Sequence, residues 1–160
     1  MGNFNVIFAA SGTGGHLFPA LFIADAIKQI KPDSVIHFIG SGRPLEKQIL
    51  GKSGYKHYKV MAVQIKNQGL LALVVFSLLL PFLLIYCLII YLRFKPKVVI
   101  GVGGYASVVP VLAAYFLRIP IWLHEAEHNP GLANKFLAKF ASKISLVHKN
   151  TSFKDKDKCI

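Results

Sequence analysis

Residues 4–16 read Phe4-Asn5-Val6-Ile7-Phe8-Ala9-Ala10-Ser11-Gly12-Thr13-Gly14-Gly15-His16. The first seven are apolar apart from Asn5 and rich in β-branched and aromatic side chains, which is typical of a buried strand in a parallel sheet. Residues 17–30, which follow, carry apolar side chains at helical spacing, with Pro19 in the first turn, where proline is tolerated. The stretch therefore predicts a strand, a tight glycine-rich turn and a helix, the first βα unit of a parallel α/β fold.

The glycine-rich turn is suited to binding an anion. Backbone N–H groups at the start of the helix and the positive end of its dipole face a common point, which favours a phosphate or diphosphate. His16, whose imidazole has a pKa near ~6.5 when unperturbed, can move a proton beside bound phosphate. The turn is not a P-loop, and Leu17 stands where a dinucleotide fingerprint has its third glycine. The alternative is a turn that only lets the helix pack closely on the sheet.

Composition limits the class of protein and the kind of partner. The 160 residues are enough for one domain, and 54% of them are hydrophobic, with a mean hydropathy of +0.50. Nineteen Lys and Arg against seven Asp and Glu give a net charge of +12, which favours anionic lipid headgroups or a diphosphate substrate. Because no basic run is interleaved with aromatic residues, nucleic acid is not an expected partner. Two cysteines and no cleavable signal favour a reducing cytoplasm.

Short apolar strands alternate with helical patterns along the rest of the chain, which predicts βαβ units around a parallel sheet. We expect further strands at 34–39, 55–65, 97–102, 119–124 and 143–147, and helices at 45–52, 106–117 and 131–140. Residues 149–158 are polar and lysine-rich and show neither pattern. The sequence therefore predicts one domain over 1–148 and a polar tail over 149–160.

Residues 70–92 contain no charged side chain and are long enough to cross a bilayer core as a helix at ~1.5 Å per residue. A single crossing would put the first three and last three predicted strands on opposite sides, so one parallel sheet could not form. Pro81 also divides the run and removes a helix hydrogen bond. We expect a crossover helix that packs on the sheet and dips an apolar face into the membrane interface; the alternatives are a wholly buried core helix and a genuine span. The cationic flanking residues are Lys66, Arg93, Lys95 and Lys97.

A second glycine turn, Gly101-Val102-Gly103-Gly104-Tyr105-Ala106-Ser107, also joins a predicted strand to a predicted helix. Ligands of open parallel sheets collect at the carboxyl ends of strands, so two such turns predict a two-sided anion site. His124 and Glu125 end another strand at the same edge, where they can orient a sugar hydroxyl or tune His16. Alternatively, Glu125 caps the next helix and His124 is a half-buried side chain with its own partner. No spacing typical of metal ligands occurs.

Three blocks of this sequence together resemble a known family. They are Thr13-Gly14-Gly15-His16-Leu17-Phe18-Pro19-Ala20, Gly101-Val102-Gly103-Gly104-Tyr105, and His124-Glu125 followed by Pro130-Gly131-Leu132-Ala133-Asn134-Lys135. They closely resemble the N-terminal half of the MurG family of bacterial glycosyltransferases. That family adds N-acetylglucosamine to undecaprenyl-diphospho-muramoyl-pentapeptide (lipid I), making lipid II for peptidoglycan. The resemblance covers nearly the whole chain.

The resemblance implies an α/β fold with a Rossmann-like parallel sheet, the acceptor-binding N-terminal half of a GT-B glycosyltransferase. It implies that His16 is the catalytic base, taking the proton of the acceptor's C4 hydroxyl in an inverting displacement. We expect no cofactor and no metal. The implied partners are lipid I, UDP-N-acetylglucosamine held by a C-terminal domain, and the anionic cytoplasmic face of the cell membrane, where the protein is peripheral. The implied substrate-binding residues are Thr13, Gly14, Gly15, Gly103, Gly104, Tyr105, Glu125 and Asn134.

Two departures from the family pattern shape the expectation. Ala126-Glu127 stands where the family usually has a hydrogen-bonding pair after His-Glu, and the sequence ends near where the donor domain should begin. We therefore expect a donor domain that is missing or separate, and a chain that binds acceptor but transfers sugar poorly alone. The runner-up is a non-catalytic, membrane-anchoring (Alg14-like) subunit of a split glycosyltransferase. A nucleotide-dependent enzyme is disfavoured, because the second strand also lacks a ribose-binding acid.

Overall fold

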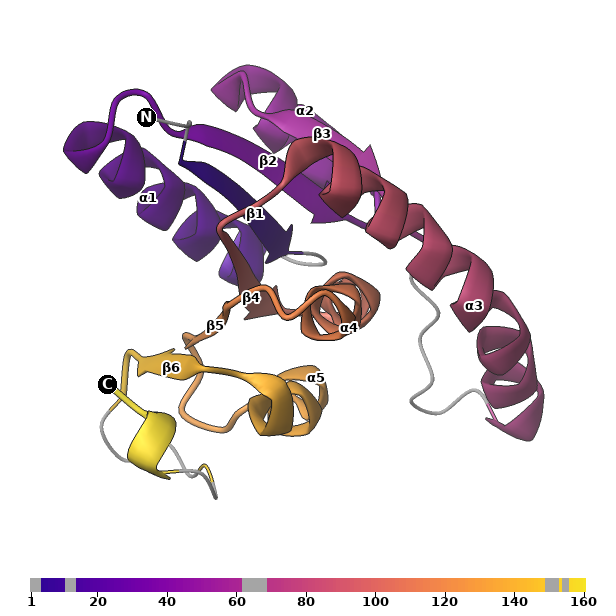
Figure 1. The fold of residues 1–160 in the computed structure, drawn as a ribbon. Coiled ribbons are helices and arrows are strands. Elements are labelled where there is room, and N and C mark those ends of the chain that lie inside the picture. Colours follow the sequence, from indigo (N-terminus) through magenta and orange to yellow (C-terminus); the bar gives the residue numbers. More distant parts are fainter. Residues whose placement is uncertain (1–3, 11–13, 62–68, 149–152, 154–155) are drawn as a thin grey trace.

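A computed structural model describes residues 4–10, 14–61, 69–148, 153 and 156–160, with the backbone alone at 69–73. It contains a six-stranded sheet in the order β3-β2-β1-β4-β5-β6, with parallel pairing throughout (Figure 1). The order reverses between β1 and β4, so a crevice is expected at their carboxyl ends. The strands are β1 Asn5–Ala10, β2 Val35–Gly40, β3 Lys56–Lys59, β4 Val98–Gly103, β5 Ile121–Glu125 and β6 Lys143–Leu146.

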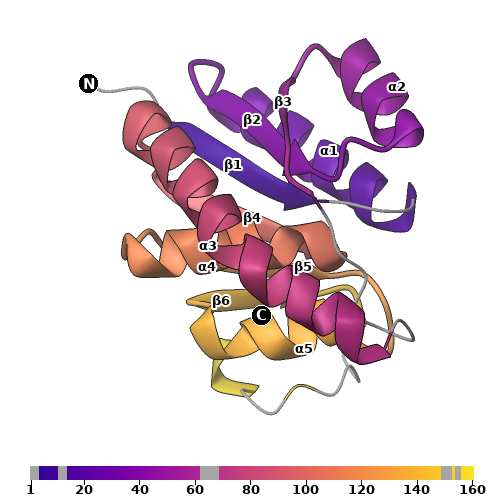
Figure 2. The same ribbon diagram turned by 90° about the vertical axis from the view of Figure 1, so that its right-hand side faces the viewer.

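Helices cover both faces of the sheet, as Figures 1 and 2 show: α1 and α2 on one face, and α3, α4 and α5 on the other. Side chains of β1 alternate between the two cores. Val6 and Phe8 pack with the first group of helices, and Ile7 and Ala9 with the second. The parallel α/β fold is therefore confirmed. The helices are α1 Gly14–Ile30, α2 Pro44–Ser53, α3 Gly69–Phe94, α4 Val108–Phe116 and α5 Leu132–Leu137.

Several boundaries differ from those expected. The first helix starts at Gly14, so both glycines belong to its first turn, and Pro19 lies inside it. The predicted helix at 106–117 begins as a 3₁₀ turn, Tyr105–Ser107, because the Ser107 hydroxyl and N–H both bond to the Gly104 carbonyl. The last predicted helix likewise becomes 3₁₀ at Ala138–Phe140. The third strand is shorter than 55–65, and residues 62–65 lie outside those described.

The described residues of the predicted polar tail pack against the domain. Phe153 is buried in the core that α3, α4 and α5 share. Cys159 lies beside Ile144 in a parallel bridge, and Ile160 both donates to the Ile144 carbonyl and accepts from the Leu146 N–H. The tail therefore covers the free edge of β6. The burial of Phe153 and the backbone hydrogen bonds to the edge strand β6 hold this segment in place although its composition is polar.

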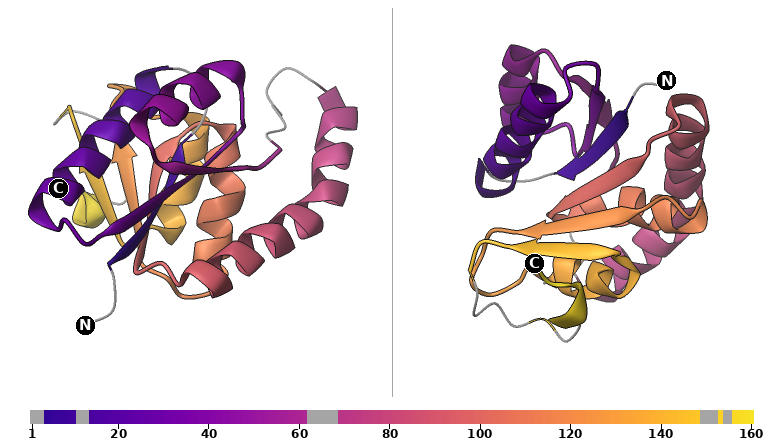
Figure 3. Two further views of the ribbon diagram at one scale, coloured as in Figure 1. Left: turned by 90° about the horizontal axis from the view of Figure 1, so that it is seen from above. Right: turned by 60° about the vertical axis from the view of Figure 1, so that its left-hand side comes forward.

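Helix α3 connects the two halves of the sheet and extends past it, bending along its length (Figure 3). Its last turns pack on α4, where the buried Tyr91 hydroxyl donates to the Pro110 carbonyl at 2.8 Å. By length and composition Val74–Phe94 is apolar enough to cross a membrane. Only 17% of its most apolar 18-residue stretch is buried in the domain. The wholly buried alternative is therefore wrong. The strands before and after the helix belong to one sheet, because β1 pairs with β4.

Candidate functional site

The two glycine turns follow neighbouring strands at the carboxyl edge of the sheet. Ala10 of β1 pairs with Gly103 of β4, next to a register shift in the ladder. Gly103 and Gly104 have φ of 103° and 83°, a backbone conformation that side chains with a Cβ rarely adopt. The second turn can therefore take this shape because both of its residues are glycine. Residues 11–13, and with them Thr13, lie outside the described part of the chain.

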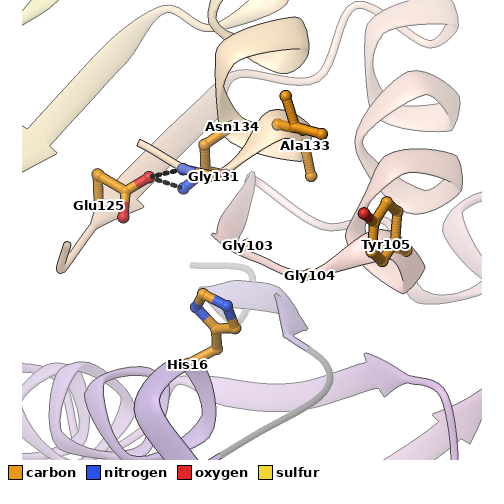
Figure 4. Close-up of a pocket in the computed structure, with 9 residues that line it drawn as sticks. His16, Gly103, Gly104, Tyr105, Glu125, Gly131, Ala133 and Asn134 are labelled. Carbon is orange, nitrogen blue, oxygen red and sulfur yellow. Dashed lines mark hydrogen bonds between the residues drawn. The ribbon is translucent and has the colours of Figure 1, made fainter. Parts of the chain in front are cut away.

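His16 projects from the first turn of α1 toward the second glycine turn (Figure 4). A Cβ built on Gly103 would lie 3.1 Å from both Nδ1 and Cε1 of the imidazole, and 3.5 Å from Nδ2 of Asn134. The ring therefore contacts the β4 turn through the space that the absent side chain leaves. The start of α1, the β4 turn and α5 meet at this point.

These segments line a pocket of about 200 Å³ at the strand reversal (Figure 4). The imidazole of His16 lies on one wall, and the 3₁₀ turn carrying Tyr105 lies on another. Six residues of the predicted site are brought together here: His16, Gly103, Gly104, Tyr105, Glu125 and Asn134. Gly14 and Gly15 lie in the same turn as His16 but do not line the pocket.

Glu125 is 1% exposed and holds the loop that follows β5. Its Oε1 accepts from the Glu127 N–H at 2.9 Å, and its Oε2 accepts from the Gly131 N–H at 3.1 Å and from Asn134 Nδ2 at 3.0 Å. Gly131 is the residue before α5. The buried carboxylate is thus satisfied by backbone and amide donors, and it fixes the start of α5 at the pocket.

His124 does not line the pocket. Its Nδ1 lies 2.8 Å from the Ser145 hydroxyl of β6, because alternate residues of a strand point to opposite faces. Burial lowers the pKa of His124 and outweighs the nearby Glu125 carboxylate, which raises it. The structure agrees with the alternative in which His124 has its own partner and Glu125 caps the next helix.

A second buried carboxylate, Glu46, was not anticipated. Its oxygens accept from the Ser41 hydroxyl and from the Gly42 N–H, and Oε2 lies 3.7 Å from Nε2 of His57. A Cβ on Gly40 would meet both the Ala10 carbonyl and Glu46 at 2.7 Å, so the β2–α2 turn packs tightly on the end of β1. Glu46 stands in the first turn of a short amphipathic helix, where a solvent-facing acid is the common case, so its sequence position gave little sign of burial.

Three pocket residues were missed as site residues: Gly131, Leu132 and Ala133. They lie within the Pro-Gly-Leu-Ala-Asn block that the sequence does single out. Their position at the start of a helix following a strand is the signal that would have identified them. Among the described residues, no group of three or more His, Cys, Asp or Glu is placed to hold a metal ion.

The geometry combines an anion-binding edge with a histidine. The β4 turn presents its glycine backbone toward the pocket, which suits a phosphate or diphosphate, and the imidazole of His16 beside it can accept a proton. The fold and pocket thus define a doubly wound α/β domain with a candidate ligand site at its topological switch point. The model of the glycosyltransferase family 28 N-terminal domain matches residues 6–146, and the chain belongs to this family.

Two curated relatives carry the same enzyme name. A UDP-N-acetylglucosamine–N-acetylmuramyl-(pentapeptide) pyrophosphoryl-undecaprenol N-acetylglucosamine transferase from Trichlorobacter lovleyi is 35% identical over 95% of this chain and 40% of its own length. A protein of the same name from Leuconostoc citreum is 41% identical over 89% of this chain and 38% of its own. The chain therefore spans about two fifths of the length of these relatives.

Solved structures support the fold. MurG from Acinetobacter baumannii superimposes with a TM-score of 0.81 at 24% identity, over 98% of this chain and 44% of that one. A UDP-GlcNAc 2-epimerase from Neisseria meningitidis gives a TM-score of 0.64 at 17% identity, over 92% and 41%. At these identities the likeness concerns the fold alone, and it agrees with the predicted N-terminal half of a GT-B protein.

Proposed function

We propose that this chain is the acceptor-binding half of an inverting N-acetylglucosaminyltransferase that converts lipid I to lipid II. The observation that carries the proposal is the meeting of His16 and the β4 glycine turn at one pocket of the strand reversal, in a chain of glycosyltransferase family 28. Backbone N–H groups at the start of α1 and in the β4 turn hold the diphosphate of the lipid-linked acceptor. The names of the relatives support this choice of substrate.

In the proposed reaction the acceptor's C4 hydroxyl oxygen attacks the anomeric carbon of UDP-N-acetylglucosamine. The hydroxyl proton passes to His16, and UDP leaves with the electron pair of the broken C–O bond, inverting the configuration. The donor nucleotide is bound by a region equivalent to the rest of the relatives' length, covalently attached or separate. Positioning and charge stabilisation supply much of such a rate enhancement, so residues 1–160 alone bind acceptor without efficient transfer.

The exposed face of α3 docks the domain on the cytoplasmic surface of the membrane. Phe82, Ile85 and Leu92 are 71%, 54% and 62% exposed, and Arg93 is exposed at the end of the helix. An apolar helix face with cationic neighbours binds an interface that contains anionic lipid. This contact brings the pocket to the layer where a polyprenyl diphosphate presents its headgroup.

Acceptor binding is tested with nanodiscs of one anionic lipid composition, prepared with lipid I, with undecaprenyl phosphate, or with neither. We expect the chain to bind the lipid I discs most tightly, because they alone offer both diphosphate and sugar. Equal affinity for all three preparations would contradict acceptor binding and leave only membrane attachment.

The catalytic role is tested by adding the C-terminal domain of the Trichlorobacter lovleyi relative and UDP-N-acetylglucosamine. His16→Ala should lower turnover by ~10²-fold or more while lipid I binding persists. Unchanged turnover would instead favour the runner-up, a non-catalytic anchoring subunit, since such a subunit needs no base.

A further inference from the structure

The outer side of α5 carries large apolar side chains. Leu132 and Phe136, which lie one helical turn apart, are 59% and 45% exposed. The opposite side of the helix, with Ala133, Asn134 and Leu137, is buried against the domain. The helix has thus already given one side to the core, and its outer side is apolar as well. Contiguous apolar side chains on a surface commonly mark a ligand-binding groove or another interaction site.

These two side chains begin a longer row of apolar groups. The ring of Phe136 packs edge-on against Phe140, with the ring centroids 5.5 Å apart. Phe140 is half-buried and packs in the same way against Tyr115, in the last turns of α4, with the centroids 4.9 Å apart. At ~1.5 Å of rise per residue, the part on residues 132–140 spans about 12 Å. The row is called the α5 stripe and consists of Leu132, Phe136, Phe140 and Tyr115.

The two ends of the α5 stripe lie at different surfaces. Leu132 lines the pocket together with His16 and the β4 turn. Tyr115 lies near the end of α4, which packs against both α3 and α5 on one face of the sheet (Figure 2). The stripe therefore leads from the pocket toward the group of helices that includes the proposed membrane-docking surface. Lys135 and Lys139 are exposed beside it, and cations at such a surface favour anionic lipid headgroups.

We propose that the α5 stripe binds the first isoprenoid units of the acceptor's polyprenyl chain. The inference rests on the proposed function, which puts the acceptor diphosphate in the pocket. The chain leaves the pocket past Leu132 and lies over Phe136 and Phe140 on its way to the bilayer. The polyprenyl chain is the part of the acceptor that must connect a headgroup in the pocket to the membrane, whereas acyl chains of the bilayer stay in the bilayer. The contact also distinguishes the acceptor diphosphate from that of UDP-N-acetylglucosamine, which carries no hydrocarbon chain.

The test compares two acceptor analogues that carry the same muramoyl-pentapeptide diphosphate, esterified either to a farnesyl chain or to a methyl group. Their dissociation constants for the 160-residue chain are measured by calorimetry without vesicles, below the concentration at which the farnesyl analogue forms micelles. We expect the farnesyl analogue to bind about tenfold or more tightly, because its chain buries apolar surface. Phe136→Ser should remove most of this preference, and Phe136→Leu, which stays apolar, should keep much of it. Phe22→Ser, at an exposed position on α1, should bind both analogues like the wild type.

The outcomes separate this inference from the proposed function. Equal affinity of the wild-type chain for the two analogues would overturn the inference while leaving acceptor binding intact. An unchanged farnesyl preference in folded Phe136→Ser and Leu132→Ser chains would overturn it as well. Failure of both analogues to bind would contradict the proposed function and the inference with it. In a last arm, Phe136→Ser should bind acceptor-free anionic vesicles like the wild type; a loss as large as that of Phe82→Asp, with the farnesyl preference intact, would assign the stripe to the bilayer instead.

Discussion

The imidazole of His16 fills the place where Gly103 lacks a side chain, 3.1 Å from the position that a Cβ would occupy. His16 belongs to the first βα unit and Gly103 to the fourth strand, and they meet because β1 and β4 are neighbours at the strand reversal. One contact thus joins the two halves of the chain at the proposed active site. Glycine is required here for two reasons. A Cβ would meet the imidazole, and the backbone φ of 103° strains any residue that has a Cβ.

Gly103→Ala should therefore displace His16 and destabilise the domain. A Cβ at this φ is strained and meets the imidazole, so we expect a loss of about 1–3 kcal/mol in the free energy of unfolding and a changed His16 NMR signal. Gly51→Ala is the matched control: Gly51 is exposed in α2, a Cβ there meets nothing within 4 Å, and alanine should stabilise the helix by about 1 kcal/mol. Equal stabilities for the two variants in urea denaturation would count against the contact.

Glu125→Ala should loosen the loop between β5 and α5. It removes the acceptor of three donors: the backbone N–H groups of Glu127 and Gly131 and the side-chain amide of Asn134. Gly131 directly precedes α5, and Asn134 lies in it. We expect a loss of about 3 kcal/mol in the free energy of unfolding, together with faster proteolysis and amide exchange at 126–131. Glu127→Ala removes an exposed carboxylate from the same loop and should change stability by less than about 0.5 kcal/mol. Similar proteolysis of both variants would show that Glu125 does not hold the loop.

Stability should fall as the solution is acidified below the pKa of unfolded histidine. Burial lowers the pKa of His37, His57 and His124 in the folded chain; for His57 it outweighs the raising effect of Glu46, and Lys47 lowers the pKa further. At a pH between ~6.5 and these lowered pKa values, the unfolded chain binds more protons than the folded chain does, so unfolding is favoured. We expect a constant Tm above about pH 7 and a decline toward pH 5. His57→Gln should make the decline shallower, and a Tm that rises on acidification would contradict this assignment.

The sequence carried enough information for the strands and for placing both glycine turns at the carboxyl edge of a parallel sheet, because strand and turn signals are local patterns. Val6 to Ala10 reads as a buried strand, and glycine at 103 and 104 marks a turn that other residues cannot make. The sequence did not reveal the roles of side chains that depend on the three-dimensional arrangement of their partners. Glu125 bonds within its own loop, Glu46 is buried beside His57, and Phe153 enters the core from a lysine-rich tail. These outcomes depend on which residues the fold brings together.

Membrane docking by α3 is tested with two phenylalanines of nearly equal exposure. Phe82 on α3 is 71% exposed and Phe22 on α1 is 70% exposed, and the two helices cover opposite faces of the sheet. Phe82→Asp should lower binding to vesicles containing anionic lipid by about tenfold or more, because an apolar side chain leaves the interface and a negative charge enters it. Phe22→Asp changes net charge equally and should bind like the wild type, and added salt should weaken binding of both. Equal flotation of the two variants would mean that the exposed face of α3 is not the membrane-binding surface.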